Sequence, residues 1–420
     1  MPQDQSISEP ARQVPVIDDV DVVVCGGGPA GTAAAVAAAR AGASVMLLER
    51  YGCLGGLATG GLVIVLPPMV RDGRQVIGGI GQETLERLLE TGEAHYRTEE
   101  RTSSRFDPEG LKRLSDEMCM AEGVGLRLHS WVVGVFGEQG RPEGVVVESK
   151  AGRQAVRAPQ IIDCTGDGDV AALAGAEWER DDKMIGLPFR LINVDLDRWE
   201  EAKHDPGLDT AAIHKEAAAL AGYESYAGVS PFPLTPGVAW GNNMHGRGDF
   251  LDPAELTKYE VAGRSAARLM TDLFREKMPG FENCWLIDTA WQIGVRCTRR
   301  IKGLYRLEYE DFEAERHYED SIGLGNDFCR PDVVYEIPLR SLIPTGLDNM
   351  LCAGRCISSD GKAMEALREI HVCWPMGEAA GLAAAMAVEG DCAVADVPVP
   401  ELQAKLQSLG GVIDIPTSGG

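Results

Sequence analysis

Long apolar runs are absent from this sequence. No stretch of its 420 residues reaches the ~20 consecutive apolar residues that a membrane-spanning helix needs. The first 17 residues are polar and contain several prolines, without the hydrophobic core of a secretory signal peptide. We therefore expect residues 1–17 to form a disordered tail, the protein to be cytoplasmic, and membranes not to be among its partners.

Closely spaced cysteines are absent as well. The chain has 11 cysteines but no C-x-x-C, and the nearest pair, Cys352 and Cys356, is a lone C-x-x-x-C. Tetrahedral zinc and iron–sulfur sites take several cysteine ligands at short spacing. We therefore expect no metal site, and cysteines that are reduced and mostly buried.

Positive charge is scarce. The chain has 40 Lys and Arg against 64 Asp and Glu, and its net charge of −24 argues against nucleic acid or an anionic membrane as partner. With 45% hydrophobic and 25% charged residues, the composition is that of an ordinary globular protein. The length allows one large α/β domain with an insertion, or two domains, and association into a homo-oligomer is left open.

Residues 21–50 combine a strand, a glycine-rich turn, a helix and a second strand. Four apolar residues at 22–25 run into glycines, and an alanine-rich segment then leads to a second apolar strand. This is G-x-G-x-x-G inside a complete βαβ unit: Gly26 allows the tight turn, Gly28 lets backbone approach a pyrophosphate, and Gly31 lets the helix pack close to the strand. The unit predicts a nucleotide site rather than a merely structural glycine turn.

The expected ligand is an ADP-ribosyl group without a 2′-phosphate. The helix N-terminus offers free N–H groups and the positive end of its dipole to phosphates. Glu49 lies 21 residues after Gly28, where its carboxylate can accept hydrogen bonds from a ribose 2′-OH. A 2′-phosphate at this place would meet like-charge repulsion.

A second glycine-rich segment, residues 51–61, follows directly and suggests backbone packed against a flat ligand. With it the sequence resembles FAD-dependent oxidoreductases of the glutathione-reductase-like, fumarate-reductase-related type. More narrowly, it is similar to those related to the flavin domain of heterodisulfide reductase A subunits. E-R-x-G-x-L-G-G followed by T-G-G is typical of them and is matched by residues 49–61. The resemblance implies FAD as the cofactor.

Residues 161–169, I-I-D-C-T-G-D-G-D, are a further segment that carries the resemblance. Flavoproteins of this type have T-G-D-G-D here, after an apolar strand and before an alanine-rich helix. Asp167 or Asp169 would accept hydrogen bonds from ribityl or ribose hydroxyls. The alternative is a pair of aspartates in an N-capping turn.

Three other segments fit the same type of flavoprotein. Residues 125–135 are predicted to be one strand of the sheet, and because the equivalent strand offers backbone groups to adenine, we nominate Val133. Residues 349–358 return to a strand followed by glycine, as the third cofactor-facing segment. Residues 365–388 predict a helix whose N-terminus points at the flavin pyrimidine ring and whose small residues pack on the first Rossmann helix.

The βαβ rhythm is lost over residues 178–345, where tryptophan, proline and charged residues increase. We expect an inserted α+β substrate domain there. The fold class is then α/β, with a glutathione-reductase-like, three-layer, Rossmann-type FAD-binding domain made of residues 18–177 and 346–392. Residues 393–420 are expected to be a tail with a short covering helix followed by disorder.

Two clusters stand out in the insertion. Residues 240–247 place His245 and an arginine between glycines, in a loop that could reach into a site. Residues 294–303 match the family pattern G-x-R-x-x-R-R-x-x-G and put Arg296, Arg299 and Arg300 at helical spacing. An anion clamp for a carboxylate or the pyrophosphate and a structural ion-pair network both remain open.

Four residues are nominated for the chemistry. Arg368, which matches the family pattern R-x-x-x-x-C-x-x-x-G, is expected to anchor a substrate, and His371 or His245 to give or take its proton. A satisfied structural role is the alternative for His371. Cys53, in the flavin-facing loop, is either a redox or covalent-attachment thiol or a small packing residue. The predicted cofactor-binding residues are Gly26, Gly28, Pro29, Ala30, Gly31, Glu49, Arg50, Gly55, Gly56, Thr59, Gly60, Val133, Thr165, Gly166, Asp169, Gly354, Arg355 and Gly377.

Three functions compete on this evidence. The first is an FAD-dependent oxidoreductase that transfers a hydride between a small organic substrate and flavin N5, in either direction. A second G-x-G-x-x-G, which would mark a separate NAD(P)H domain, is absent. The second function is an electron-transfer subunit that docks on a partner protein, and the third is a flavin-binding module with a structural or RNA-modifying role. The absence of cluster cysteines weakens the second, and the acidic balance disfavours the third.

Overall fold

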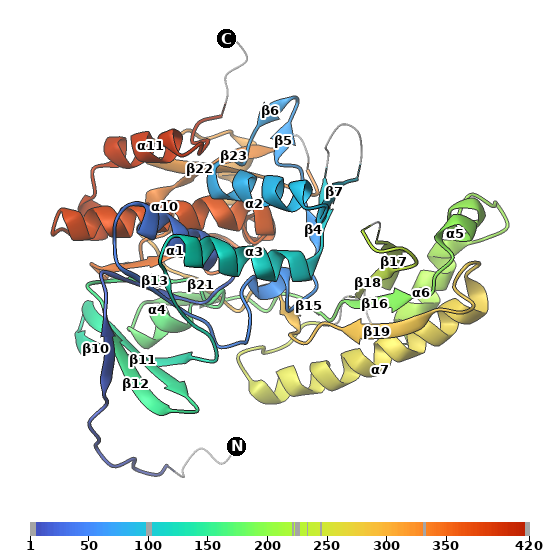
Figure 1. The fold of residues 1–420 in the computed structure, drawn as a ribbon, viewed down its shortest axis with the longest axis horizontal. Helices are drawn as coiled ribbons and strands as arrows, with labels where there is room; N and C mark the ends of the chain where they lie inside the picture. The colour runs from blue at the N-terminus through green and yellow to red at the C-terminus, as the bar shows by residue number, and fades with distance from the viewer. Residues whose placement is uncertain are drawn as a thin grey trace.

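A five-stranded parallel sheet forms the centre of the larger body of the molecule (Figure 1). The structure is a computed structural model, and it describes residues 6–97, 103–220, 222, 227–232, 234–243, 246–330 and 333–415. All four neighbouring pairs of strands in this sheet are parallel. In spatial order the strands are β24 (Met350–Cys352), β13 (Gln160–Asp163), β2 (Val22–Cys25), β3 (Val45–Leu48) and β9 (Gly125–Arg127).

The central sheet is covered on both faces, because its strands are apolar on both. Val22 and Val24 share a core with the helices, and Val23 and Cys25 share another with a four-stranded sheet. Sheet, helices and second sheet make three layers, which agrees with the predicted Rossmann-type fold. The helices are α1 (Pro29–Arg40), α2 (Gly79–Glu90), α3 (Pro108–Ala121) and α10 (Ile370–Glu389), and the second sheet is β1 (Val16–Asp19), β12 (Gly152–Arg157), β11 (Arg141–Ser149) and β10 (Trp131–Glu138).

Helices α1 and α10 pack backbone against backbone. A Cβ built on Gly377 would clash with the carbonyl oxygen of Ala30, and one on Gly381 would clash with that of Ala34. Glycine at these two positions of α10 therefore permits the close approach that the alanine-rich helix α1 offers. Gly377 thus contacts the first Rossmann helix, as its small-residue surroundings predicted.

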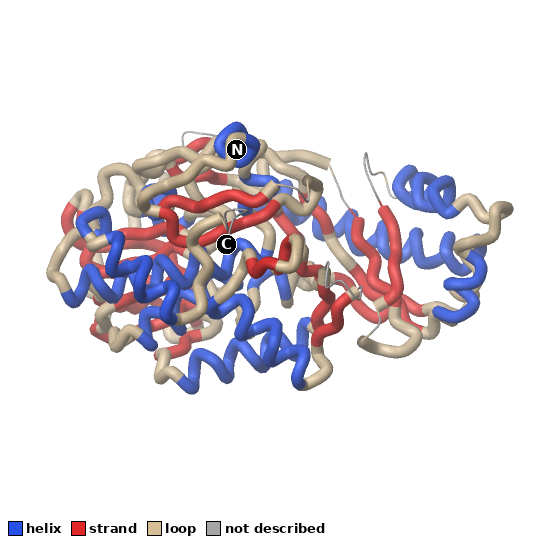
Figure 2. The backbone as a smooth tube through the Cα atoms, turned by 90° about the horizontal axis from the view of Figure 1, so that it is seen from above, coloured by secondary structure: helices blue, strands red, loops and turns tan. Residues whose placement is uncertain are grey.

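A separate lobe stands beside the body in Figures 1 and 2. Its sheet has the order β17-β18-β16-β19, and helices pack on one face of it around a core of their own that includes Phe189, Met270 and Phe274. The lobe strands are β16 (Phe189–Ile192), β17 (Ala227–Pro231), β18 (Ala239–Asn243) and β19 (Trp285–Thr289). Its helices are α5 (Leu196–Ala202), α6 (Thr210–Leu220) and α7 (Pro253–Lys277).

The lobe is shorter than the predicted insertion over 178–345. Within that range β22 (Ser321–Asn326) pairs with β23 (Val334–Pro338) and contacts α10 in the body. Helix α8 (Tyr309–Glu313) contacts β23 and therefore also belongs with the body by its contacts. The domain boundaries deduced from sequence remain predictions.

Two smaller expectations differ from the structure. The predicted strand over 125–135 is broken at His129, whose φ of +54° is left-handed, so β9 and β10 lie in different sheets. Residues 294–303 form no helix: β20 (Gly294–Val295) and β21 (Arg299–Ile301) pair with β15 (Ile185–Gly186) and β14 (Trp178–Arg180).

The two ends of the chain also contain regular structure. Near the N-terminus β1 pairs with β12, so residues 16 and 17 of the predicted tail lie in a strand. Beyond residue 393, α11 (Val399–Ser408) buries Leu402 and Leu406 and contacts α10, which agrees with the expected covering helix.

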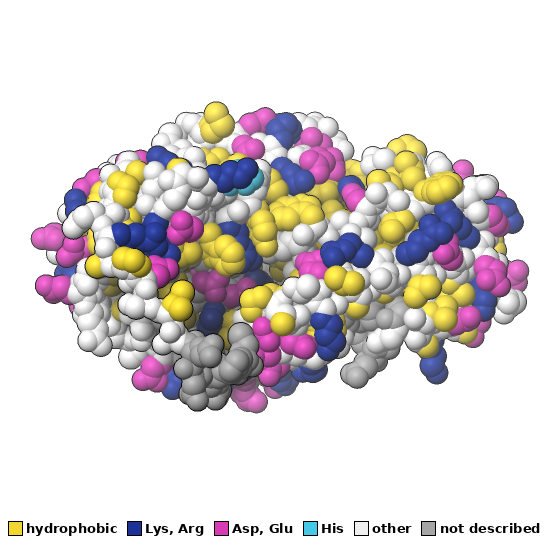
Figure 3. Space-filling model, turned by 90° about the horizontal axis from the view of Figure 1, so that it is seen from below, with side chains coloured by type: hydrophobic (Ala, Val, Ile, Leu, Met, Phe, Trp, Pro, Cys, Tyr) yellow, Lys and Arg dark blue, Asp and Glu magenta, His cyan; other side chains and the backbone are white. Residues whose placement is uncertain are grey.

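Two further features are the distribution of charge on the surface and the apolar length of the helices. Acidic and basic side chains are interspersed over both the body and the lobe on the face shown in Figure 3. Among the helices that the structure describes, none is long and apolar enough to cross a bilayer.

Candidate active site

A cavity of about 1060 Å³ runs from the carboxyl ends of the parallel strands to the lobe. Carboxyl ends of parallel strands are where ligands bind in open α/β sheets. Glycines from four separate turns line it, namely Gly28, Gly56, Gly166 and Gly354. The turns after β2, β3, β13 and β24 therefore converge on one space.

The turn before α1 has the properties of a pyrophosphate site. The first intrahelical bond runs from Thr32 N to Gly28 O, which leaves the N–H groups of Ala30 and Gly31 without an acceptor inside the helix, and no acidic residue lies in the first turn. A Cβ built on Gly28 would have Gly56 Cα, 3.9 Å away, as its nearest neighbour, so this side of Gly28 is open. The N–H groups of Ala30 and Gly31 and the open space beside Gly28, which we call the cradle, fit the pyrophosphate of FAD.

Glu49 holds the same turn from the end of β3. Its Oε2 accepts a 2.7 Å hydrogen bond from Gly27 N, and its Oε1 accepts a 2.9 Å bond from Tyr51 N. The carboxylate is buried and lines the cavity. Its contact with a ribose hydroxyl remains a prediction.

Asp163, which the sequence reasoning did not nominate, organises the T-G-D-G-D turn. It is fully buried and accepts hydrogen bonds from Thr165 N at 2.9 Å, Thr165 Oγ1 at 2.6 Å and Ala171 N at 2.8 Å. Burial raises the pKa of Asp163, and these hydrogen bonds oppose that rise. An aspartate that ends a buried strand directly before a glycine-rich turn was the available signal.

The two aspartates of T-G-D-G-D contact the arginine cluster. Asp169 pairs with Arg299 at 2.7 Å, and Asp167 accepts from Thr298 Oγ1 at 2.7 Å and pairs with Arg355 at 3.3 Å. Arg300 pairs with carboxylates on and after β14, those of Glu179 and Asp181. Arg299 and Arg300 thus have the contacts of the ion-pair alternative.

Arg296 differs from its two neighbours because it lines the cavity. Burial and the nearby Arg368 lower the pKa of Arg296. Arg368 also lines the cavity and pairs with Glu365 at 3.1 Å and Glu369 at 3.3 Å. Burial raises the pKa of Glu369, and Arg368 and Arg296 oppose it. This end of the cavity is therefore charged with both signs.

The other nominated residues have different surroundings. His371 is fully buried away from the cavity lining, and its Nε2 lies 2.6 Å from Asn326 Oδ1. The structural alternative is met only in part, because its Nδ1 is also buried and has no hydrogen-bond partner among the described residues. Cys53 is half-buried outside the lining, beside Thr59, and burial raises the pKa of its thiol. These are the surroundings of a packing residue. His245 lies outside the described residues.

Most of the nominated cofactor residues line the cavity. They are Gly26, Gly28, Pro29, Ala30, Glu49, Arg50, Gly56, Thr165, Gly166, Asp169, Gly354 and Arg355. Six do not, namely Gly31, Gly55, Thr59, Gly60, Val133 and Gly377. Val132, the neighbour of Val133 in β10, lines the cavity instead. All the individual cofactor contacts remain predictions.

One of the cavity residues that the sequence reasoning did not nominate is a buried arginine. Arg105, in β8 (Ser104–Phe106), is 5% exposed and lines the cavity where the body meets the lobe. It donates hydrogen bonds to Ser230 Oγ at 2.9 Å and to the Pro231 carbonyl. No motif surrounds it, and its partners are more than a hundred residues away in the chain, so no local signal could have identified it.

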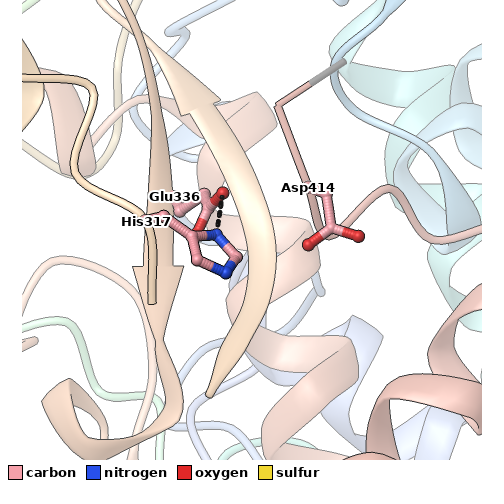
Figure 4. A group of neighbouring side chains, drawn as sticks. All are labelled: His317, Glu336 and Asp414. Carbon is pink, nitrogen blue, oxygen red and sulfur yellow. Dashed lines mark hydrogen bonds and ion pairs between the residues drawn. The ribbon is translucent and has the colours of Figure 1, made fainter. Parts of the chain in front are cut away.

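A small polar cluster lies apart from the cavity. His317 Nδ1 and Glu336 Oε1 are 3.0 Å apart, and Asp414 lies nearby without a bond to either (Figure 4). Glu336 raises the pKa of the exposed His317. Glu336 also accepts a bond from Tyr318 N, so it has a structural use of its own.

Comparisons with known proteins agree with this geometry. A family model described as FAD-dependent oxidoreductase matches residues 21–406. A solved geranylgeranyl bacteriochlorophyll reductase-like protein from Thermoplasma acidophilum is 17% identical, with a TM-score of 0.51, over 93% of this chain and 83% of its own. At this identity the likeness shows the fold alone.

Two further solved structures are less similar. A flavoprotein/dehydrogenase from Cytophaga hutchinsonii is 14% identical, with a TM-score of 0.49 over 93% of this chain and 86% of its own. A p-nitrophenol 4-monooxygenase from Pseudomonas putida is 12% identical, with a TM-score of 0.45 over 94% of this chain and 90% of its own. The family match, together with the cavity that the glycine turns share, places this chain in the FAD-dependent oxidoreductase family, as an enzyme with FAD as its cofactor.

Proposed function

We propose that this enzyme transfers a hydride between a small organic substrate and N5 of FAD. One observation carries the proposal: the glycine turns and the lobe strands line the same cavity. Bound FAD supplies the hydride chemistry at N5. The residues of the chain then have to hold the cofactor, enclose the substrate and manage one proton.

The cofactor would be held mainly by backbone. Free N–H groups at the start of α1 would bind the pyrophosphate, and the Glu49 carboxylate would accept from the adenosine ribose. Arg355, which pairs with Asp167, and the Thr165–Gly166 turn would border the middle of the cofactor. Glycine at 28 leaves the space that this requires.

The substrate would lie between the body and the lobe. Ser230 and Trp240 of the lobe line the cavity together with Arg368 and Arg296 of the opposite wall. The lobe would exclude water from the reacting atoms, and Arg368 would orient the substrate. Glu365 and Glu369 already neutralise the positive charge of Arg368. Arg368 would therefore bind a neutral polar group of the substrate more readily than it would bind a carboxylate.

Proton transfer would involve a hydroxyl group of the cavity wall. Tyr309 lines the cavity and donates a 2.6 Å hydrogen bond to Asp327 Oδ2. Burial, followed by the bond to Asp327, raises the pKa of Tyr309 to about 12, so its phenol stays protonated at neutral pH. Tyr309 is therefore our nominee for giving the substrate a proton or receiving it back.

The finer relationship suggested by the sequence is part of the proposal. Three layers, with the antiparallel strands β10, β11 and β12 on one face of the parallel sheet, support the glutathione-reductase-like subtype. The E-R-x-G-x-L-G-G and T-G-D-G-D segments support a relationship to the flavin domain of heterodisulfide reductase A subunits.

Anaerobic flavin reduction tests the function. Purified holoprotein is mixed with candidate alcohols, amines, acids and saturated carbonyl compounds, and the visible absorbance of its flavin is followed. In the reverse direction, chemically reduced holoprotein is mixed with enones and enoates. We expect at least one class to bleach or restore the absorbance stoichiometrically. Exchange of electrons with redox proteins alone would instead support an electron-transfer subunit.

A further inference from the structure

Arg105 is a buried arginine that joins the two walls of the cavity. It comes from the body, in the sheet β4 (Val65–Leu66), β8 and β7 (Ala94–Tyr96), and its two hydrogen bonds to described residues both go to β17 of the lobe. Only 5% of the residue is exposed. Its position is therefore fixed from both sides before any ligand arrives.

Three other arginines of the cavity wall have acidic partners. Arg355 pairs with Asp167, Arg368 with Glu365 and Glu369, and Arg330 with Glu313. For Arg105, no carboxylate within 4.0 Å is found in the described part of the chain. Both groups that it bonds, a hydroxyl and a peptide carbonyl, are neutral.

The guanidinium also has an unused donor. Arg105 Nε is buried and has no hydrogen-bond partner among the described residues. Burial, and then the neighbouring Arg97, lower the pKa of Arg105 to about 10. A buried cation that lacks both a counter-charge and one hydrogen bond is costly unless a ligand supplies them.

Apart from the neighbouring Arg97, Arg105 also has an aromatic ring close to it. Its Cζ lies 5.8 Å from the centre of the Trp240 ring, and Trp240 Nε1 is held by a 2.9 Å bond to Leu62 O. Val63, Val65 and Pro67 line the same cavity. A ligand that satisfies Arg105 would therefore place a nonpolar body against Trp240 and these side chains.

We propose that the substrate is an organic acid with an apolar body, and that Arg105 binds its carboxylate. A planar carboxylate would supply both the missing negative charge and an acceptor for Nε. The inference rests on the proposed function, because it takes the ligand of this cavity to be the substrate. Arg105 would thus be a specificity-determining residue at the interface of body and lobe.

Calorimetric titration of the holoprotein measures this binding without turnover. The probes are benzoate and trans-cinnamate, their uncharged amides, and inorganic phosphate. We expect an acid to bind roughly 10- to 100-fold more tightly than its amide, because a charge-assisted bond is lost in the amide. Equal binding of acid and amide, tighter binding of phosphate than of either acid, or no binding of either acid at millimolar concentration would each overturn the proposal.

Three variants test whether the tighter binding of the acid depends on Arg105. Arg105→Gln should weaken binding of the acid to the level of the amide, and Arg105→Lys should retain part of the preference. Arg264→Gln removes an exposed arginine of α7, paired with Glu260, and should bind as the parent does. Flavin content, read from the absorbance ratio of each variant, checks that the cofactor site is intact. If Arg105→Gln binds the acid as the parent does, the assignment fails.

The outcomes separate this inference from the proposed function. Acid binding that depends on Arg105, without flavin reduction by any substrate, would support the anion site while the hydride-transfer function fails. Flavin reduction by a neutral substrate, unchanged in Arg105→Gln, would support the function and overturn the anion site. If Arg105→Gln does not fold, the ratio of the affinities for acid and amide is compared between the parent and Arg105→Lys. The same ratio in both would overturn the assignment of Arg105.

Discussion

Glu378 Oε2 in α10 accepts a 3.0 Å hydrogen bond from the backbone N–H of Ile80, in the first turn of α2. Its other oxygen, Oε1, is buried and has no hydrogen-bond partner in the described part of the chain. Burial raises the pKa of Glu378 from its ordinary value of 4.5 to about 7. A buried carboxyl therefore joins two helices that are far apart in sequence.

Glu378 predicts a pH dependence of stability. Because its pKa is higher in the folded than in the unfolded protein, its contribution is complete below pH 4.5 and is lost as the pH rises through about 7. The shift corresponds to a loss on the order of 3 kcal/mol. In Glu378→Gln the melting temperature should fall less between pH 5 and 8 than in the parent, as measured by circular dichroism. Glu90→Gln, at an exposed position of α2, should follow the parent.

Gly28 and Gly31 should respond differently to the same substitution. A Cβ on Gly28 enters the open cradle, so Gly28→Ala should fold with an unchanged apoprotein melting temperature but retain less flavin. A Cβ on Gly31 clashes with the carbonyl oxygen of Gly26, so Gly31→Ala should lose about 1–3 kcal/mol of stability. Differential scanning fluorimetry and the flavin-to-protein absorbance ratio measure the two effects. Equal flavin retention in Gly28→Ala and the parent would contradict the prediction that the open space beside Gly28 holds the cofactor.

His371 is predicted to act on stability rather than on proton transfer. Burial lowers its pKa from 6.5 to about 3, so the folded protein keeps it neutral, and stability should decline as the pH falls from 6.5 towards 3. His371→Gln, which can still donate to Asn326, should reduce that decline. The pH profile of flavin reduction should keep its shape in this variant, and a changed apparent pKa in that profile would show that His371 takes part in proton transfer.

Asp163 is predicted to hold the T-G-D-G-D turn. Asp163→Ala would leave the buried donor Ala171 N without its acceptor, at a cost of about 1–3 kcal/mol, and would also remove the acceptor of the partly buried Thr165 N. Urea denaturation should reveal the loss, and flavin content should fall with it because Thr165 lines the cavity. Asp348→Ala, at an exposed position before β24, is the control and should change neither quantity.

The local parts of the site could be predicted from the sequence. The strand, turn and helix over 22–40 follow from a contiguous pattern of apolar residues, glycines and alanines, and the structure contains β2 and α1 there. Asp107 caps α3 by accepting a hydrogen bond from Glu109 N, and an aspartate directly before a proline is a local signal for such a helix start. Such features depend on neighbouring residues, so their chemistry can be read locally.

The features that depend on distant parts of the chain could not be predicted. Arg299 and Arg300 have helical spacing, but pairing with β14 draws them into a strand. His371 shares a helix with residues near the cavity, yet Asn326 of β22 holds its ring in the interior. Arg105 is placed by hydrogen bonds to a lobe strand more than a hundred residues later. In each case a tertiary partner decided the outcome.

The contact of Gly377 with Ala30 and of Gly381 with Ala34 links the two ends of the reaction space. Helix α1 begins at the phosphate-binding turn, and α10 begins beside Arg368 and Glu369. A larger side chain at either glycine would have to separate the two helices. This would displace both the phosphate-binding turn and the charged residues Arg368 and Glu369. A substitution at either glycine should therefore impair cofactor retention and substrate binding together. Engineering of the cofactor site would in the same way be limited by its effect on the substrate site.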